Sequence, residues 1–208
     1  MFDTSIRRRI DPWLDRSASV LVRCGLHADV ITVIGFAIGI GGCAAIAFQQ
    51  YTLALCLIAT NRVADGLDGA VARQSRPTDA GGYLDIVLDM IFYSGVPFAF
   101  ALARVEFVLP AAFLIYSFVG TGGSFLAYAV ISAKRGITQD REAKKSFYYA
   151  MGLMEGTETI VFLFLFCMFP NHFAILAWSF GGLCWLTTAA RIIAGIISFR
   201  EPSAKDVQ

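Results

Sequence analysis

The stretch DGLDGAVARQSRPTDAGGYLDIVLD, residues 65–89, decides how the rest of the chain is interpreted. It contains five acidic residues and four glycines, and apolar sequence of helical character flanks it on both sides. Asp65 and Asp68 are three residues apart and Asp85 and Asp89 are four apart, so on helices each pair lies on one face. Because carboxylates in one pocket repel each other unless cations lie between them, the stretch predicts a divalent-metal site.

The overall composition is that of a membrane protein. Of the 208 residues, 57% are hydrophobic and the net charge is only +1. The mean hydropathy of +0.63 is higher than in an ordinary soluble domain. The five cysteines are scattered and form no CxxC pair, so we expect buried small side chains rather than disulfides or a zinc site. We expect neither a cleavable signal peptide nor a nucleic-acid partner.

Apolar segments predict an all-α, polytopic membrane protein with six transmembrane helices. The first such segment, 28–48, would rise about 31 Å as a helix, which is enough to cross the hydrocarbon core of a bilayer. The six predicted spans are 28–48, 51–73, 80–103, 107–133, 147–169 and 173–199. Together they would form one transmembrane domain, residues 28–199, followed by a short tail, residues 200–208.

Residues 1–27 are predicted to form an amphipathic helix on the membrane surface. Asp11 is suited to the N-cap, Pro12 to the first helical position and Gly25 to the C-terminal stop. Apolar residues follow Pro12 at helical spacing, and five arginines in this segment favour an anionic lipid surface. The alternative is a solvated basic arm.

Lysine and arginine are concentrated on one side of the predicted membrane domain. Of the 17 basic residues, 14 fall in the terminal segments and the loops of that side. Arg104 lies on the other side, and Arg62 and Arg191 fall inside spans. The positive-inside rule therefore predicts that both termini and the acidic stretch are cytoplasmic, at the inner membrane if the organism is bacterial.

The acidic stretch is suited to phosphoryl chemistry. Carboxylate oxygens suit Mg²⁺, Mn²⁺ or Ca²⁺, and carboxylates combined with substrate phosphates are the usual Mg²⁺ arrangement. Such a cation would neutralise charge that develops on a phosphoryl group. The alternatives are interfacial charges that reach the headgroups and glycines that serve only close helix packing. Arg73 is suited either to a diphosphate or to anchoring a helix end.

The residues also carry a family resemblance. Asp65-x-x-Asp68-Gly69-x-x-Ala72-Arg73, followed by Gly81-x-x-x-Asp85-x-x-x-Asp89, resembles the signature of the CDP-alcohol phosphotransferase (CDP-alcohol phosphatidyltransferase) family. All eight signature residues are present in order, although the seven residues between Arg73 and Gly81 are one fewer than in the family's usual pattern. The resemblance implies a homodimeric membrane transferase of phospholipid biosynthesis, which moves a phosphatidyl group from CDP-diacylglycerol to a small alcohol and releases CMP.

The resemblance also assigns roles to individual residues. The metal ligands, for Mg²⁺ or Mn²⁺, would be Asp65, Asp68, Asp85 and Asp89. Asp89 would in addition act as the general base toward the acceptor hydroxyl. The nucleotide-binding residues would be Gly69, Ala72, Arg73, Gly81 and Thr32. Asp29 stands where relatives often have Asn, and its charge would repel a phosphate.

Residues of the later spans would select the acceptor. The candidate acceptor-binding residues are Lys134, Arg135, Arg191, Glu155 and Glu158. A phosphorylated acceptor, such as glycerol 3-phosphate or inositol phosphate, would need two or three of these cations. Positive-inside topology is an alternative explanation for Lys134 and Arg135. Arg191 needs a partner inside the membrane, and Glu155 or Glu158 could supply it; the two glutamates could instead join helices.

Two other enzyme or transport classes also place acids in membrane helices. A divalent-cation transporter is disfavoured because the acids cluster at one membrane face and no broken helix pair supports alternating access. A Mg²⁺-dependent intramembrane prenyltransferase would have more than six spans and no use for the DG-x-x-AR sequence. A structural membrane protein with a fortuitous motif is the remaining alternative.

Overall fold

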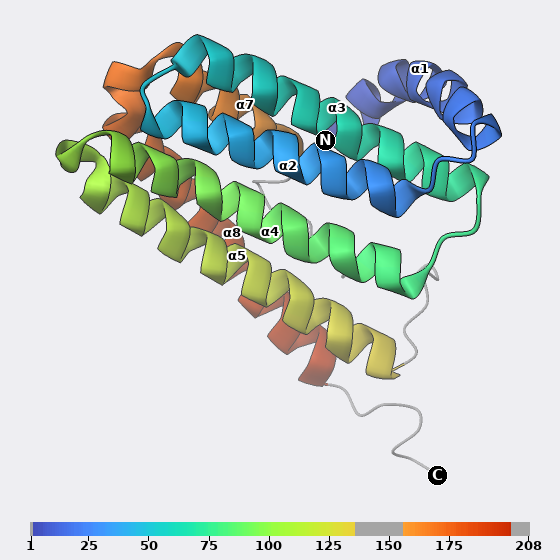
Figure 1. Cartoon of the computed structure of the whole chain (residues 1–208). Helices are drawn as coiled ribbons and strands as arrows, with labels where there is room; N and C mark the ends of the chain where they lie inside the picture. Colours follow the sequence, from blue (N-terminus) through green and yellow to red (C-terminus); the bar gives the residue numbers. More distant parts are fainter. Residues whose placement is uncertain (1, 136–155, 201–208) are drawn as a thin grey trace.

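A computed structural model describes residues 2–135 and 156–200, with side chains from residue 12 onward (Figure 1). Within these residues the protein is helical and has no strand. The helices are α1 (Phe2–Arg23), α2 (Ala28–Ala47), α3 (Tyr51–Gln74), α4 (Asp79–Ala103), α5 (Val108–Arg135), α7 (Gly156–Met168) and α8 (Phe173–Arg200). Short 3₁₀ turns, Val105–Phe107 and Pro170–His172, precede α5 and α8.

The helices have the surface of a membrane protein. Four described stretches are long and apolar enough to cross a bilayer: Ala28–Ala47, Asp79–Ala103, Val105–Arg135 and Pro170–Arg200. Only 17–33% of each apolar stretch is buried inside the protein, so most of the apolar surface faces outward and requires a lipid environment. The all-α membrane fold is therefore confirmed. The predicted count of six spans is not, because α3 is polar in its second half and the described part of α7 has 13 residues.

The N-terminal helix differs from the prediction in where it begins. α1 starts at Phe2 and contains Pro12 in its interior, so the predicted start at Asp11 is wrong. A proline fits the first turn of a helix, but a longer helix also tolerates one at the loss of a hydrogen bond, and the local sequence does not separate the two cases. The predicted stop is confirmed, because Gly25 adopts a φ of 76° just beyond the end of α1.

α1 lies against α3 and leaves one face exposed. Ala18 of α1 is fully buried against Ala70 and Val71 of α3. Trp13, on the outer side, is 71% exposed, with the Arg16 guanidinium 6.0 Å from its ring. An exposed tryptophan beside an arginine is suited to the headgroup region of a membrane, but the placement of α1 at a membrane surface stays a prediction.

α2 is the central helix of the layer that holds the acidic stretch. In Figure 1 it lies between α3 and α4, and it packs extensively on both. α3 and α4, by contrast, have little direct backbone contact among the described residues. Glycines on α2 permit the close packing, because a side chain at these positions would overlap the neighbouring helices. A Cβ on Gly35 would lie 2.9 Å from the Ala64 Cβ, and a Cβ on Gly39 would lie 2.8 Å from the Phe92 ring. The two glycines therefore serve the close helix packing that their spacing indicates.

Gly39→Ala is expected to destabilise the protein by about 1–3 kcal/mol, because the added methyl group overlaps the Phe92 ring and the Asn61 amide. The matched control is Gly41→Ala on the same helix, whose Cβ would meet only Leu57 at an ordinary 3.8 Å. Thermal unfolding in detergent micelles measures the difference. Equal melting temperatures for the two variants would contradict this account of the α2 packing.

A cluster of phenylalanines anchors the other end of the helices. The Phe100 and Phe173 rings stack with centroids 4.1 Å apart, and Phe107 and Phe166 contact Phe173 edge-on. All four rings are almost fully buried. This packing joins α4, α7 and α8 into a rigid base, from which the carboxylate-bearing turns of α4 extend.

Candidate metal centre

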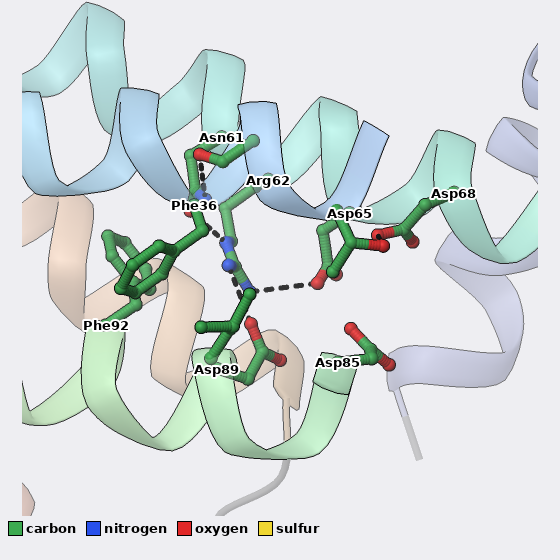
Figure 2. Close-up of a pocket in the computed structure, with 11 residues that line it drawn as sticks. Phe36, Asn61, Arg62, Asp65, Asp68, Asp85, Asp89 and Phe92 are labelled. Atoms are coloured by element: carbon green, nitrogen blue, oxygen red, sulfur yellow. Dashed lines mark hydrogen bonds and ion pairs between the residues drawn. The ribbon is translucent and has the colours of Figure 1, made fainter. Parts of the chain in front are cut away.

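The two acid pairs face each other across a gap between α3 and α4. Asp65 and Asp68 lie in the second half of α3, and Asp85 and Asp89 lie in the first half of α4. Thr78 caps α4 by accepting a hydrogen bond from the Gly81 amide at 3.0 Å, which sets where the helix begins. Figure 2 shows the four carboxylates converging from the two helices. Because α2 separates the backbones of α3 and α4, the gap has room for these side chains.

Three of the four carboxylates form one compact group. One oxygen each of Asp65, Asp85 and Asp89 lies within 4.8 Å of the others, and the three residues are partly buried. Asp68 lines the same pocket but is more deeply buried, at 6% exposure, and accepts a hydrogen bond from the Thr32 hydroxyl at 2.6 Å. The sequence-based expectation of a single group of acids is thus met by three side chains, with Asp68 held beside them by α2.

A buried arginine forms the inner wall of this pocket. The Arg62 side chain is 6% exposed, and its Nη2 donates to Asp89 Oδ1 at 2.9 Å. Its Nη1 lies 3.7 Å from Asp65 Oδ1 and donates to the Tyr93 hydroxyl at 2.7 Å. Figure 2 shows the guanidinium reaching from α3 toward Asp89. The pocket therefore combines one resident cation with four carboxylates, which leaves it with a net negative charge suited to further cations.

The other signature residues lie outside this pocket, toward α1. Arg73 is exposed, with Nη2 3.6 Å from Asp15 Oδ1 of α1. Gly69 is open except for the Arg73 guanidinium, and Ala72 is half-buried on the same helix. These three residues leave an accessible surface at the end of α3, next to the carboxylates.

Gly81 lies close to Asp29 of α2. A Cβ on Gly81 would lie 2.5 Å from Asp29 Oδ1, so a larger residue at position 81 would require the exposed Asp29 side chain to move. The approach places the Asp29 carboxylate against the first turn of α4, where unpaired backbone N–H groups favour a negative charge. The structure thus places Asp29 beside the beginning of α4, and its effect on a bound phosphate stays a prediction.

The described acceptor candidates are spread over α5, α7 and α8. Arg135 donates to the Phe199 carbonyl at 2.7 Å, and Arg191 donates to the Thr121 carbonyl at 3.1 Å. Lys134 is exposed near the end of α5, and Glu158 lies in the first turn of α7. Glu155 lies outside the described residues. None of the four described residues lines the carboxylate pocket, so their role stays a prediction.

Comparison with known proteins identifies the family. The family model for CDP-alcohol phosphatidyltransferase matches residues 25–197. The chain belongs to the CDP-alcohol phosphatidyltransferase family. The resemblance seen in the signature is thereby confirmed, and the matched range of this phosphatidyltransferase covers every signature residue.

Relatives of this phosphatidyltransferase include bacterial and archaeal proteins. It is 47% identical to the inner membrane protein YnjF of Escherichia coli K12 over 202 residues, which are 97% of this chain and 98% of that protein. It is 27% identical to the archaetidylinositol phosphate synthase of Pyrococcus horikoshii over 191 residues, 91% of this chain and 94% of that one.

Solved structures share the fold of the phosphatidyltransferase. The phosphatidylinositol phosphate synthase PgsA1 of Mycobacterium tuberculosis with CDP-DAG bound superposes with a TM-score of 0.65 at 20% identity, covering 88% of this chain and 93% of that chain. The same enzyme in complex with manganese and citrate gives a TM-score of 0.63 at 18% identity, covering 88% of each chain.

Sequence reasoning overlooked Arg62 and its partners Asn61 and Tyr93. A signal was present, because a lone arginine in an apolar helix needs a partner, and Arg62 precedes Asp65 by three residues on the same helix face. The contact between Arg62 and Asp89 could not be predicted from the sequence, because the two residues are 27 positions apart and lie on different helices.

Proposed function

We propose that this phosphatidyltransferase uses a divalent cation to transfer the phosphatidyl group of CDP-diacylglycerol to a small phosphorylated alcohol, with release of CMP. The observation that carries the proposal is the convergence of Asp65, Asp85 and Asp89, whose oxygens lie within 4.8 Å of one another in a pocket between two helices. An oxygen-rich, negatively charged site of this kind is suited to a hard cation, and the cation would in turn bind a diphosphate.

The residues present fit Mg²⁺ or Mn²⁺. The donor set is composed of carboxylates from Asp65, Asp68, Asp85 and Asp89, and Arg62 offsets only part of their charge. The bound cation would neutralise charge on the diphosphate and make CMP a better leaving group. A structural neighbour described as a complex with manganese and citrate supports the choice of cation.

Side chains of the protein are proposed to accept the proton of the acceptor hydroxyl and to bind the nucleotide. Asp89 accepts the proton of the acceptor hydroxyl. The acceptor oxygen forms a new bond to the lipid-bearing phosphorus, and the bond from that phosphorus to the CMP oxygen breaks. Arg73 binds the nucleotide phosphates at the accessible end of α3. The remaining proposed nucleotide contacts are Thr32, Gly69, Ala72 and Gly81.

The acceptor is proposed to carry its own phosphate. Relatives named archaetidylinositol phosphate synthase support an inositol phosphate. The cations proposed for the phosphate are Lys134 and Arg135 at the end of α5, and Arg191 further inside α8. Glu155 and Glu158 are proposed to hydrogen-bond the acceptor hydroxyls.

We further propose that both termini and the site are cytoplasmic, since 14 of 17 basic residues would lie on that side. A homodimer is proposed because the family resemblance implies one. Cysteine-accessibility labelling of each terminus and cross-linking in membranes test these two points. Labelling of either terminus from the outer side only would overturn the orientation.

Purified protein supplied with CDP-diacylglycerol and a panel of acceptors is expected to prefer a phosphorylated alcohol. We expect kcat/KM for inositol 1-phosphate or glycerol 3-phosphate to exceed that for inositol, glycerol or serine by about tenfold or more, because charge-assisted contacts to the phosphate contribute roughly 1.5–3 kcal/mol each. CMP release measures turnover, and proteoliposomes should accumulate no Mn²⁺. A preference for an unphosphorylated alcohol would overturn the acceptor assignment while leaving the transferase activity intact.

A further inference from the structure

Arg62 is held in the acidic pocket by contacts that do not depend on the carboxylates. Its Nε donates to Asn61 Oδ1 at 2.8 Å, and the Asn61 amide is itself fixed by donating to the Gly35 carbonyl at 2.9 Å. The guanidinium carbon lies 4.6 Å from the Phe92 ring centroid and 5.0 Å from that of Tyr93. Rings of α4 and an amide of α3 therefore fix the cation at the inner wall of the pocket.

The Arg62 guanidinium donates a hydrogen bond to one of the two carboxylate oxygens of Asp89, Oδ1. Nη2 binds Oδ1 at 2.9 Å, so Oδ2 is the oxygen left to face a cation or an acceptor hydroxyl. Arg62 Nη1 also lies 3.7 Å from Asp65 Oδ1, three residues further along the same helix, α3, whereas Asp89 belongs to α4. The Arg62 guanidinium thus contacts one acid on each helix and restrains how closely these carboxylates approach each other.

We propose that Arg62 is a positioning residue for the catalytic carboxylate. It holds Asp89 by Oδ1 and keeps that side chain from binding the divalent cation through both of its oxygens. This inference rests on the proposed function. It assigns to Arg62 a role that the signature residues do not include.

Arg62 has opposite effects on cation binding and on turnover. A positive charge fixed a few ångströms from a divalent cation weakens the binding of that cation by Coulomb repulsion. The same charge keeps Asp89 oriented for proton transfer, and a misplacement of about 1 Å can cost about 100-fold in rate. Removal of the charge should therefore tighten cation binding and slow the reaction, whereas a general loss of structure would weaken both.

The test compares Arg62→Gln with the wild-type protein and with Arg104→Gln. Arg104 is a matched control, because its guanidinium also lies over a ring, Phe107, at 5.4 Å, and also pairs with an amide, Asn171, and a carboxylate, Glu106. Mn²⁺ binding is measured directly by electron paramagnetic resonance at about pH 8, where carboxylates are ionised. Values of kcat and KM come from CMP release at saturating Mn²⁺.

We expect Arg62→Gln to lower the Kd for Mn²⁺ by about threefold or more and to lower kcat by about tenfold or more, with KM for CDP-diacylglycerol little changed. Arg104→Gln should leave all three values within about twofold. Weaker Mn²⁺ binding in Arg62→Gln, or an unchanged kcat, would overturn the inference. Wild-type protein that neither binds Mn²⁺ nor releases CMP would instead overturn the proposed function itself.

A second variant keeps the test decisive if Arg62→Gln does not fold. Tyr93→Phe removes only the hydroxyl that accepts from Nη1 at 2.7 Å and retains the ring beneath the guanidinium. It should lower kcat by less than Arg62→Gln does and leave the Kd for Mn²⁺ within about twofold, because Arg62 keeps its charge but loses one of its restraints. Parallel losses of Mn²⁺ affinity and kcat in Tyr93→Phe would count against the positioning role.

Discussion

Asp89→Asn is expected to lower kcat for CMP release by about 100-fold to 10,000-fold, the range that a positioned general base contributes. Asparagine has the same shape and retains an oxygen to accept the 2.9 Å hydrogen bond from Arg62, but it cannot take a proton from the acceptor hydroxyl. The measurement is CMP release at saturating CDP-diacylglycerol and acceptor. Thermal unfolding in detergent should change little, since the side-chain volume is conserved.

Asp79→Asn is the matched control for this prediction, because Asp79 is an exposed acid in the first turn of the same helix and does not line the pocket. It should retain near wild-type turnover. A Mn²⁺ titration separates the two roles proposed for Asp89. If excess Mn²⁺ restores kcat in Asp89→Asn, the residue is only a metal ligand; if kcat stays low, the base assignment stands.

Removal of divalent cations is expected to abolish CMP release, and Mg²⁺ or Mn²⁺ should restore it. Without a cation, the carboxylates of Asp65, Asp85 and Asp89 remain within reach of one another and repel a diphosphate instead of binding it. Binding should also stabilise the fold, by about 2.7 kcal/mol at a cation concentration of 100 times Kd. A rise of a few degrees in melting temperature on adding Mn²⁺ is therefore expected.

Asp65→Asn and Asp85→Asn provide the controls for cation removal. Each deletes one charge from the compact group of acids, so each should shift the cation titration to higher concentration and reduce the Mn²⁺-induced rise in melting temperature. Full turnover in protein shown by elemental analysis to be free of divalent metal would contradict the metal requirement and, with it, the proposed chemistry of the site.

Parts of the fold that depend on local sequence were predictable. The end of α1 at Gly25 follows from backbone conformation at one residue, and the beginning of α4 near Thr78 follows from one cap. The beginning of α1 was predicted wrongly, because a proline such as Pro12 can occupy either the first turn or the interior of a helix, depending on whether the preceding residues are helical. A helix end is predictable when the conformation or hydrogen bond of one residue determines it. It is not predictable when it depends on whether a longer segment is helical.

The sequence by itself determined the helical membrane class, the identity of the acids and their grouping into two pairs, because these follow from hydropathy and from spacing along one helix. Only the tertiary structure decided that α2 lies between α3 and α4, that Thr32 binds Asp68 at 2.6 Å, and that Arg62 holds Asp89. Spacing along a helix defines which residues share a face, but packing between helices decides which faces meet. Contacts across 27 and 36 positions depend on small residues such as Gly39 that let the helices approach.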